Sequence, residues 1–249
     1  MARPRVKPIH DAEKIMKELL AAVAEFYVET GELKLTAEEF SMSALKIRKL
    51  LITAGVYHND ASDEVNRLFA QGKSPEEIAK ITGLGKSSVN GYLPYTKVVY
   101  KPEELSQNAE RINVFRSRQK VVEELQEDLS SDILWKAVVA FQGYPFHTAT
   151  GLAFVYEMKK GRGDGYNKEL IVNRCKESKS IVWSSVKQAF EHALALRGSV
   201  ADRPEDLGDI RGVSYIYPLL YRFGLIDVPD EVAEKMQLRG GIRKSAAKR

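Results

Sequence analysis

The chain has 249 residues, of which 44% are hydrophobic and 29% charged, and its formal net charge is +4. These proportions are ordinary for a folded protein with real cores, and they exclude a disordered tail protein, a collagen-like fibre and a disulfide-rich mini-protein. No stretch approaches the roughly 18 apolar residues of a membrane span, and no apolar run follows the charges at the start of the chain. We therefore expect a cytoplasmic protein of one or two domains, with no membrane partner.

Cysteine and histidine are too sparse to predict a metal centre. The lone cysteine, Cys175, excludes an internal disulfide and a multi-cysteine zinc cage, and we interpret it as a small apolar side chain in a strand. The four histidines, His10, His58, His147 and His192, show neither HxxxH nor HExxH spacing. The sequence therefore predicts no metal and no cofactor.

Positive charge gathers at both ends of the chain. Residues 1–9 form a basic arm that contains Arg3 and Arg5, and residues 237–249 form a basic tail. Neither segment has apolar periodicity, so both are interpreted as solvated arms. Extended arginines such as Arg3 and Arg5 can enter the narrow minor groove of A·T-rich DNA, although a leader without a role explains them equally well.

Apolar residues spaced three and four apart predict a run of helices in the N-terminal half. The first and longest is expected at 11–30 and ends before Gly31. Further helices are expected at 36–41, 43–54, 62–70, 74–82 and 86–93, and an extended connector follows at 96–100. This arrangement predicts a mainly α N-terminal half.

The clearest motif lies in residues 75–93 and has the spacing of a helix-turn-helix. Ala79 is the small residue needed where the second helix crosses the first, and Gly83 tolerates the positive φ of the tight turn. Val89 is the aliphatic residue expected on the inner face of the second helix. The other apolar positions complete a small core: Ile78, Leu84 and Tyr92.

This motif resembles the helix-turn-helix of bacterial transcription regulators and region 4 of sigma factors, over about 20 residues. The resemblance implies that the second helix enters the major groove of double-stranded DNA. The positions expected to face outward there, toward base edges or phosphates, are Gly85, Lys86, Ser87, Ser88, Asn90 and Gly91. Lys97 and Lys101 lie just beyond and would grip the DNA backbone or remain solvated. The alternative is a chance helical hairpin in an all-α bundle.

A weaker second copy precedes this motif, in residues 35–51. Aligned on Ile47 as the inner residue, Ala37 and Leu50 fall at matching positions, while Ser41 replaces the turn glycine. The DNA contacts that this copy predicts are Ser43, Ala44, Lys46 and Lys49. Two such motifs in tandem, as in paired-type DNA binders and transposase-like proteins, would cover successive segments of the major groove, whereas the alternative is a supporting helical pair.

The second half of the chain has a different pattern. A helical linker is expected at 102–144, with a long charged helix at 103–129 that suits a spacer or a homodimer contact better than a core element. A smaller α+β domain is expected at 145–236, with strands at 152–158 and 169–173 forming a β-hairpin and a helix at 180–196. The segment at 213–226 contains Pro218 and Gly224, so a broken helix or a packed turn is expected there. This domain could bind an effector, dimerise or contact nucleic acid.

One pattern in this domain has a catalytic alternative. Glu157 and Lys159 form an E-x-K at the end of a strand, which resembles part of the pattern of Mg²⁺-dependent PD-(D/E)xK nucleases. The nearest upstream acid is Asp132, and it has the position of a helix cap. We therefore assign no catalytic residue.

The sequence as a whole predicts a sequence-specific DNA-binding protein, most simply a bacterial transcriptional regulator associated with the nucleoid. Two recognition helices in residues 10–101 would read the major groove, and lysine and arginine contacts with phosphates would supply affinity. The alternative is a DNA-targeted nuclease or mobile-element protein of the transposase or recombinase kind. Double-stranded DNA is the expected partner, with a homodimer as a second expected association.

Overall fold

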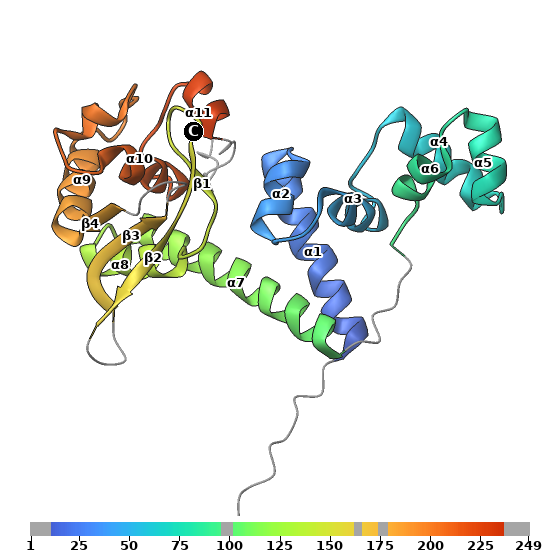
Figure 1. Cartoon of the computed structure of the whole chain (residues 1–249), viewed down its shortest axis with the longest axis horizontal. Helices are drawn as coiled ribbons and strands as arrows, with labels where there is room; N and C mark the ends of the chain where they lie inside the picture. The colour runs from blue at the N-terminus through green and yellow to red at the C-terminus, as the bar shows by residue number, and fades with distance from the viewer. Residues whose placement is uncertain (1–10, 96–101, 162–165, 174–178, 237–249) are drawn as a thin grey trace, which may run out of the picture. The chain divides into compact units, whose positions relative to one another are not determined.

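The computed structural model describes residues 11–95, 102–161, 166–173 and 179–236 (Figure 1). In these ranges helices dominate the N-terminal half, and a four-stranded antiparallel sheet lies in the C-terminal part, so the expected fold class is confirmed. The chain divides into two compact units, Met1–Phe115 and Arg116–Arg249. Several predicted features lie outside the described residues: Arg3, Arg5, the connector at 96–100, Lys97, Lys101, Cys175 and the basic tail.

Short helices closed by capping residues build the first unit. Polar side chains of Asp11, Ser43, Asn59 and Ser74 accept hydrogen bonds from the free backbone N–H groups at four helix starts. The elements are α1 (Ala12–Thr30), α2 (Leu33–Glu39), α3 (Ala44–Thr53), α4 (Asp60–Ala70), α5 (Pro75–Thr82), α6 (Lys86–Tyr92) and the first part of α7 (Pro102–Glu127).

Helices α1, α2 and α3 enclose the larger core of the first unit. At its centre the rings of Phe26, Phe40 and Phe115 contact one another, with centroids 4.9 to 6.3 Å apart. Phe115 comes from α7, which also contributes Ile112 to this core. Edge-to-face and tilted ring pairs of this kind add to the stabilisation from buried area.

Helices α4, α5 and α6 enclose a separate and much smaller core. Its buried members are Val65, Leu68, Ile78 and Val89, and partly buried residues such as Leu84 pack around them. In Figure 1 these three helices, drawn in cyan and green, gather into one bundle. The chain from 60 to 93 therefore forms a three-helix unit with its own apolar centre.

Helix α7 differs from the linker expected at 102–144. Its first part supplies Ile112 and Phe115 to the core of the first unit, and its second part supplies Val121, Val122 and Leu125 to the core of the second. The expectation that this helix is not a core element is therefore wrong, while the homodimer contact stays a prediction. The boundary expected near 130–145 also differs, because the chain divides between Phe115 and Arg116.

The second unit surrounds its sheet with helices. Its further elements are α8 (Ser131–Ala140), β1 (Phe146–His147), β2 (Ala153–Lys160), β3 (Tyr166–Asn173), β4 (Lys179–Val182), α9 (Trp183–Ala195), the 3-10 helix η1 (Pro204–Leu207), α10 (Val213–Arg222) and α11 (Asp230–Met236). The strands pair in chain order, and all pairs are antiparallel. Alternate residues such as Tyr156, Met158 and Leu170 point into the core, as the two-residue period of a strand requires.

Two parts of the second unit depart from the predicted elements. The helix expected at 180–196 begins only at Trp183, because the preceding residues pair with β3 as strand β4, with Ile181 opposite Leu170. In the segment at 213–226, α10 runs through Pro218 without a break and ends at Arg222, shortly before Gly224 with its positive φ of 70°. Residues 215–222 of α10 are all buried, and this burial offsets the cost of about 3 kcal/mol for a proline inside a helix.

Among the residues that the structure describes, no helix combines the length and the apolar character needed to cross a bilayer.

Candidate nucleic-acid interface

Helices α5 and α6 meet through a tight glycine turn. Gly83 closes α5 in the left-handed conformation, with φ 71° and ψ 5°, and Gly85 then opens α6 with extended backbone. At the other end of α5, the Ser74 side chain and Glu77 form a capping box. The turn therefore has the positive φ that the sequence motif requires of Gly83.

The inner faces of the two helices hold this geometry. Ile78 on α5 and Val89 on α6 are completely buried in the core that they share with α4. Ala79 and Leu84 pack against the same core. Because Val89 fixes the inner side of α6, its neighbours along the helix must point away from the core.

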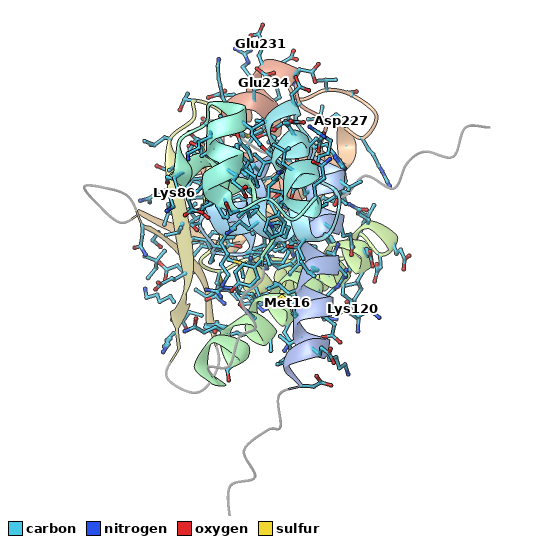
Figure 2. The ribbon with its side chains drawn as sticks, turned by 90° about the vertical axis from the view of Figure 1, so that its right-hand side faces the viewer. Met16, Lys86, Lys120, Asp227, Glu231 and Glu234 are labelled. Atoms are coloured by element: carbon cyan, nitrogen blue, oxygen red, sulfur yellow. The ribbon has the colours of Figure 1, made fainter. Side chains whose placement is uncertain are left out.

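The outer face of α6 is polar and open. Ser87, Ser88 and Asn90 are exposed, as is Lys86, whose side chain lies at the edge of the three-helix unit in Figure 2. The Lys86 Nζ atom lies 2.6 Å from Glu76 Oε1 at the start of α5. This hydrogen-bonded ion pair lowers the pKa of Glu76 below its ordinary value, so the carboxylate is ionised at neutral pH.

Gly91 does not lie on the open face, where the sequence motif placed it. It is buried, and a Cβ atom built on it would lie 3.3 Å from Leu45 Cδ1 of α3. The prediction failed because the motif considers only α5 and α6, and the covering residue lies 46 positions earlier in the chain.

The weaker copy, α2 and α3, has the same local geometry. Ser41 is the non-glycine residue with positive φ among the described residues, with φ 48°, at the position that corresponds to Gly83. Ile47 and Leu50 are completely buried, and Ala37 is 9% exposed. Arg111 of α7 donates to the Ser41 carbonyl at 3.5 Å. Helices α1, α2 and α3 therefore form another three-helix unit with a left-handed turn.

The DNA contacts predicted on α3 fall into two groups. Ser43 and Ala44 are exposed at its start, and Ser43 Oγ accepts the N–H of Lys46 at 3.3 Å as a helix cap. The Lys46 and Lys49 side chains are half-buried, and Lys46 Nζ lies 5.7 Å from the centroid of the Tyr95 ring. The start of α3 is therefore open, and the side of the helix that carries Lys46 is partly covered.

The end of α6 and the residues that follow it cover this side of α3. The Arg48 guanidinium lies over the Tyr92 ring, 5.2 Å from its centroid, and the backbone N–H of Tyr95 donates to Thr53 Oγ1 at 2.7 Å. Such cation–π contacts are attractive and directional. Arg48 and Tyr95 could not be found from the sequence, because no local periodicity signals a contact between residues 40 or more positions apart.

The charge distribution of the two contacting segments is one-sided. Residues 40–58 and 78–101 contain no Asp or Glu, whereas each contains several cations. The cations are Lys46, Arg48, Lys49, Lys80, Lys86, Lys97 and Lys101. Acidic residues are frequent in α1 and α2 instead. Over the described residues, the contact between α3 and α6 thus brings together residues 40–58 and 78–95, whose own charges are all positive, with Glu76 beside them.

The E-x-K residues of the second unit lie on the outer face of the sheet. Lys159 Nζ forms an ion pair with Glu169 Oε2 at 2.7 Å, and Glu169 also accepts a hydrogen bond from Ser180. This pairing lowers the pKa of Glu169. Glu157 is exposed opposite Ile171. In the part of the chain that the structure describes, no group of three or more His, Cys, Asp or Glu side chains could hold a metal ion.

Comparisons with protein-family models, with curated proteins and with solved structures find no significant match to this chain.

Proposed function

We propose that this protein binds double-stranded DNA sequence-specifically with α6 in the major groove, and that it acts as a bacterial transcriptional regulator on the nucleoid. The observation that supports this most strongly is the geometry of α4, α5 and α6. The left-handed turn at Gly83 and the buried Val89 hold α6 so that Ser87, Ser88 and Asn90 point away from the core.

The exposed side chains of α6 are suited to reading base edges. An asparagine can form two hydrogen bonds with the N6 and N7 atoms of adenine, and serine hydroxyls can donate or accept at any base. We therefore assign base contacts to Asn90, Ser87 and Ser88. Lys86 would exchange its ion pair with Glu76 for a phosphate oxygen or a guanine.

Phosphate contacts would come from the cations close to α6. Lys46 and Lys49 on α3 lie in the segment without acidic residues that contacts the end of α6. Each phosphate contact adds about 0.9 to the slope of log affinity against log salt concentration. Neutralising Lys46, Lys49 or Lys86 should therefore weaken binding to all sequences and flatten the slope by up to about one unit each.

Selection from random duplex DNA, followed by fluorescence anisotropy on the enriched duplex, tests the proposal. We expect Asn90→Ala to reduce the preference for the selected sequence by about 1–3 kcal/mol, the value of a good bidentate base contact. The matched control is Arg67→Ala, which removes an exposed cation of the same three-helix unit that already pairs with Glu64 at 2.7 Å. Equal effects of the two substitutions, or no enriched sequence, would contradict the proposal.

A further inference from the structure

We infer that α3 and α6 engage DNA as one block at a single segment of the major groove, with α6 in the groove and α3 on the adjoining phosphate backbone. This inference rests on the proposed function and deepens it. It replaces the simpler expectation that each helix-turn-helix reads its own groove segment.

The contacts between the two helices support it first. Leu45 of α3 reaches the buried Gly91 of α6, and Arg48 packs on Tyr92 one residue further along. The hydrogen bond from the Tyr95 N–H to Thr53 Oγ1 then fastens the chain beyond α6 to the end of α3. Three different kinds of contact thus connect the same two segments.

The dimensions of DNA exclude an arrangement in which α3 and α6 each bind a separate segment of the major groove. Helices in contact have axes about 8–10 Å apart. Successive major-groove segments on one face of B-DNA lie about 34–36 Å apart. Because α3 and α6 are in contact, they cannot occupy two successive segments without breaking all the contacts between them.

A single groove segment has room for one of the two helices. The major groove is about 12 Å wide and accepts one α-helix. Helix α6 presents exposed polar side chains, whereas one side of α3 is covered by residues 91–95. Helix α6 therefore suits the groove, and α3, with Lys46 and Lys49, suits the negatively charged wall beside it.

This arrangement gives Arg48 a different role from its neighbour Lys49. The Arg48 guanidinium is held over the Tyr92 ring and its Nε atom is buried without a hydrogen-bond partner, so Arg48 orients α6 rather than binding a phosphate. Arg48 is thus a positioning residue. Lys49 lies one position along the same helix and is the matched cation for comparison.

A cysteine pair across the contact tests the inference directly. In a Cys175→Ser background, Leu45→Cys removes the side-chain atom that lies closest to position 91, and Gly91→Cys places a thiol in the space. The oxidised and reduced forms of this one variant are compared on the selected duplex by anisotropy. We expect affinities within about threefold of each other, because the helices remain together on DNA.

Two outcomes would overturn the inference. One is a loss of more than tenfold in affinity on oxidation, which would show that the helices must separate to bind. The other is a cysteine pair that cross-links in the free protein and fails to cross-link when the selected duplex is bound, which would show the same separation.

A second measurement needs no substitution, so it does not depend on how the cysteine variant folds. For one protomer per duplex, established by light scattering, we expect the selected site to be one continuous block within about half a helical turn. Two blocks about 10 base pairs apart at the same stoichiometry would overturn the inference. Absence of any DNA binding would instead refute the proposed function.

The role of Arg48 has its own test. Arg48→Ala should lower the ratio of specific to non-specific affinity about tenfold and leave the salt slope unchanged, because α6 loses its orientation but no phosphate contact is lost. Lys49→Ala should do the reverse and flatten the slope by up to about one unit. An equal flattening in both variants would show that Arg48 contacts phosphate and is not a positioning residue.

Discussion

The two three-helix units of the N-terminal half share one spacing and differ in what supports it. Ala37, Ser41 and Ile47 in the first unit correspond to Ala79, Gly83 and Val89 in the second, with the same intervals between them. Both turns are left-handed. The unit formed by α1, α2 and α3 (the α1–α3 unit), however, rests on a long α1 and on part of α7, whereas four residues make up the buried core of the unit formed by α4, α5 and α6 (the α4–α6 unit).

This difference shows how stability and recognition are divided. A helix-turn-helix needs a turn and an inner residue to fix its angle, and those determinants are local. The stability of the unit depends on the apolar area that the rest of the chain buries against it. The α1–α3 unit thus has the larger supporting core, and the α4–α6 unit presents the more open polar helix.

Phe115→Ala is the substitution that should produce the largest difference in stability between the α1–α3 unit and the α4–α6 unit. It removes a ring that is 1% exposed and contacts both Phe26 and Phe40, so we expect the free energy of unfolding of the α1–α3 unit to fall by about 3–5 kcal/mol. Amide exchange by mass spectrometry should show protection lost in residues 12–53 and retained in 60–93. Equal losses in both segments would contradict the separation into two cores.

Ile78→Ala is the corresponding change in the α4–α6 unit. Ile78 is completely buried, and we expect a loss of about 2–4 kcal/mol, enough to open a unit with so small a core. The same exchange measurement should now show protection lost in 60–93 and retained in 12–53. The variant should also lose DNA binding, and full protection of 60–93 would show that another part of the chain stabilises this unit.

The two turn residues should respond differently to substitution, with a loss of stability expected at Gly83 and none at Ser41. A Cβ at Gly83 meets no atom within 4 Å, so Gly83→Ala adds only the strain of a left-handed residue, a net loss of about 1 kcal/mol. Ser41 already carries that strain, so Ser41→Gly should leave stability unchanged or raise it by less than about 1 kcal/mol. Denaturant midpoints measure both, and a clear loss of stability in the Ser41→Gly variant would contradict this explanation.

The smallest expected effect on stability concerns His58, which lies between α3 and α4 and so connects the α1–α3 unit to the α4–α6 unit. Its ring nitrogens lie 3.0 Å from Asp63 Oδ1 and 3.1 Å from the Gly55 carbonyl oxygen. The hydrogen bond with Asp63, and then the one with Gly55, raise the pKa of His58 above its ordinary value of about 6.5.

The sign of the pH dependence follows from that direction. Because the folded-state pKa is raised, the contribution of His58 to stability is complete below the ordinary pKa and is lost as the pH rises through the raised one. The midpoint difference between the wild type and His58→Ala should therefore be larger at pH 5.5 than at pH 8.5. An NMR titration in which the pKa of His58 is unshifted would contradict this explanation. So would a raised pKa of His58 that the Asp63→Asn substitution does not lower.

The sequence could predict the features that depend on neighbouring residues. Gly83 and Val89 define their turn within a few positions, and Asp11 and Ser74 mark helix starts in the same local way. The alternation around Tyr156 likewise predicts a strand.

The remaining features depend on distant partners. Strand β4 is four residues long, and Ile181 fits the apolar face of a following helix as well as it fits a strand; only its pairing with Leu170 decides between them. The sequence does not reveal that α7 contributes to two cores, because Phe115 belongs to one core and Leu125 to the other. Likewise, no local pattern indicates that Arg48 packs on Tyr92.

Amide exchange with and without the selected duplex is the most direct test of α6 as the reading helix. We expect bound DNA to slow exchange in residues 85–95 and at the start of α3, around residues 43–49. Slower exchange confined to the β2–β3 hairpin, with the amides of α6 unchanged, would contradict the account.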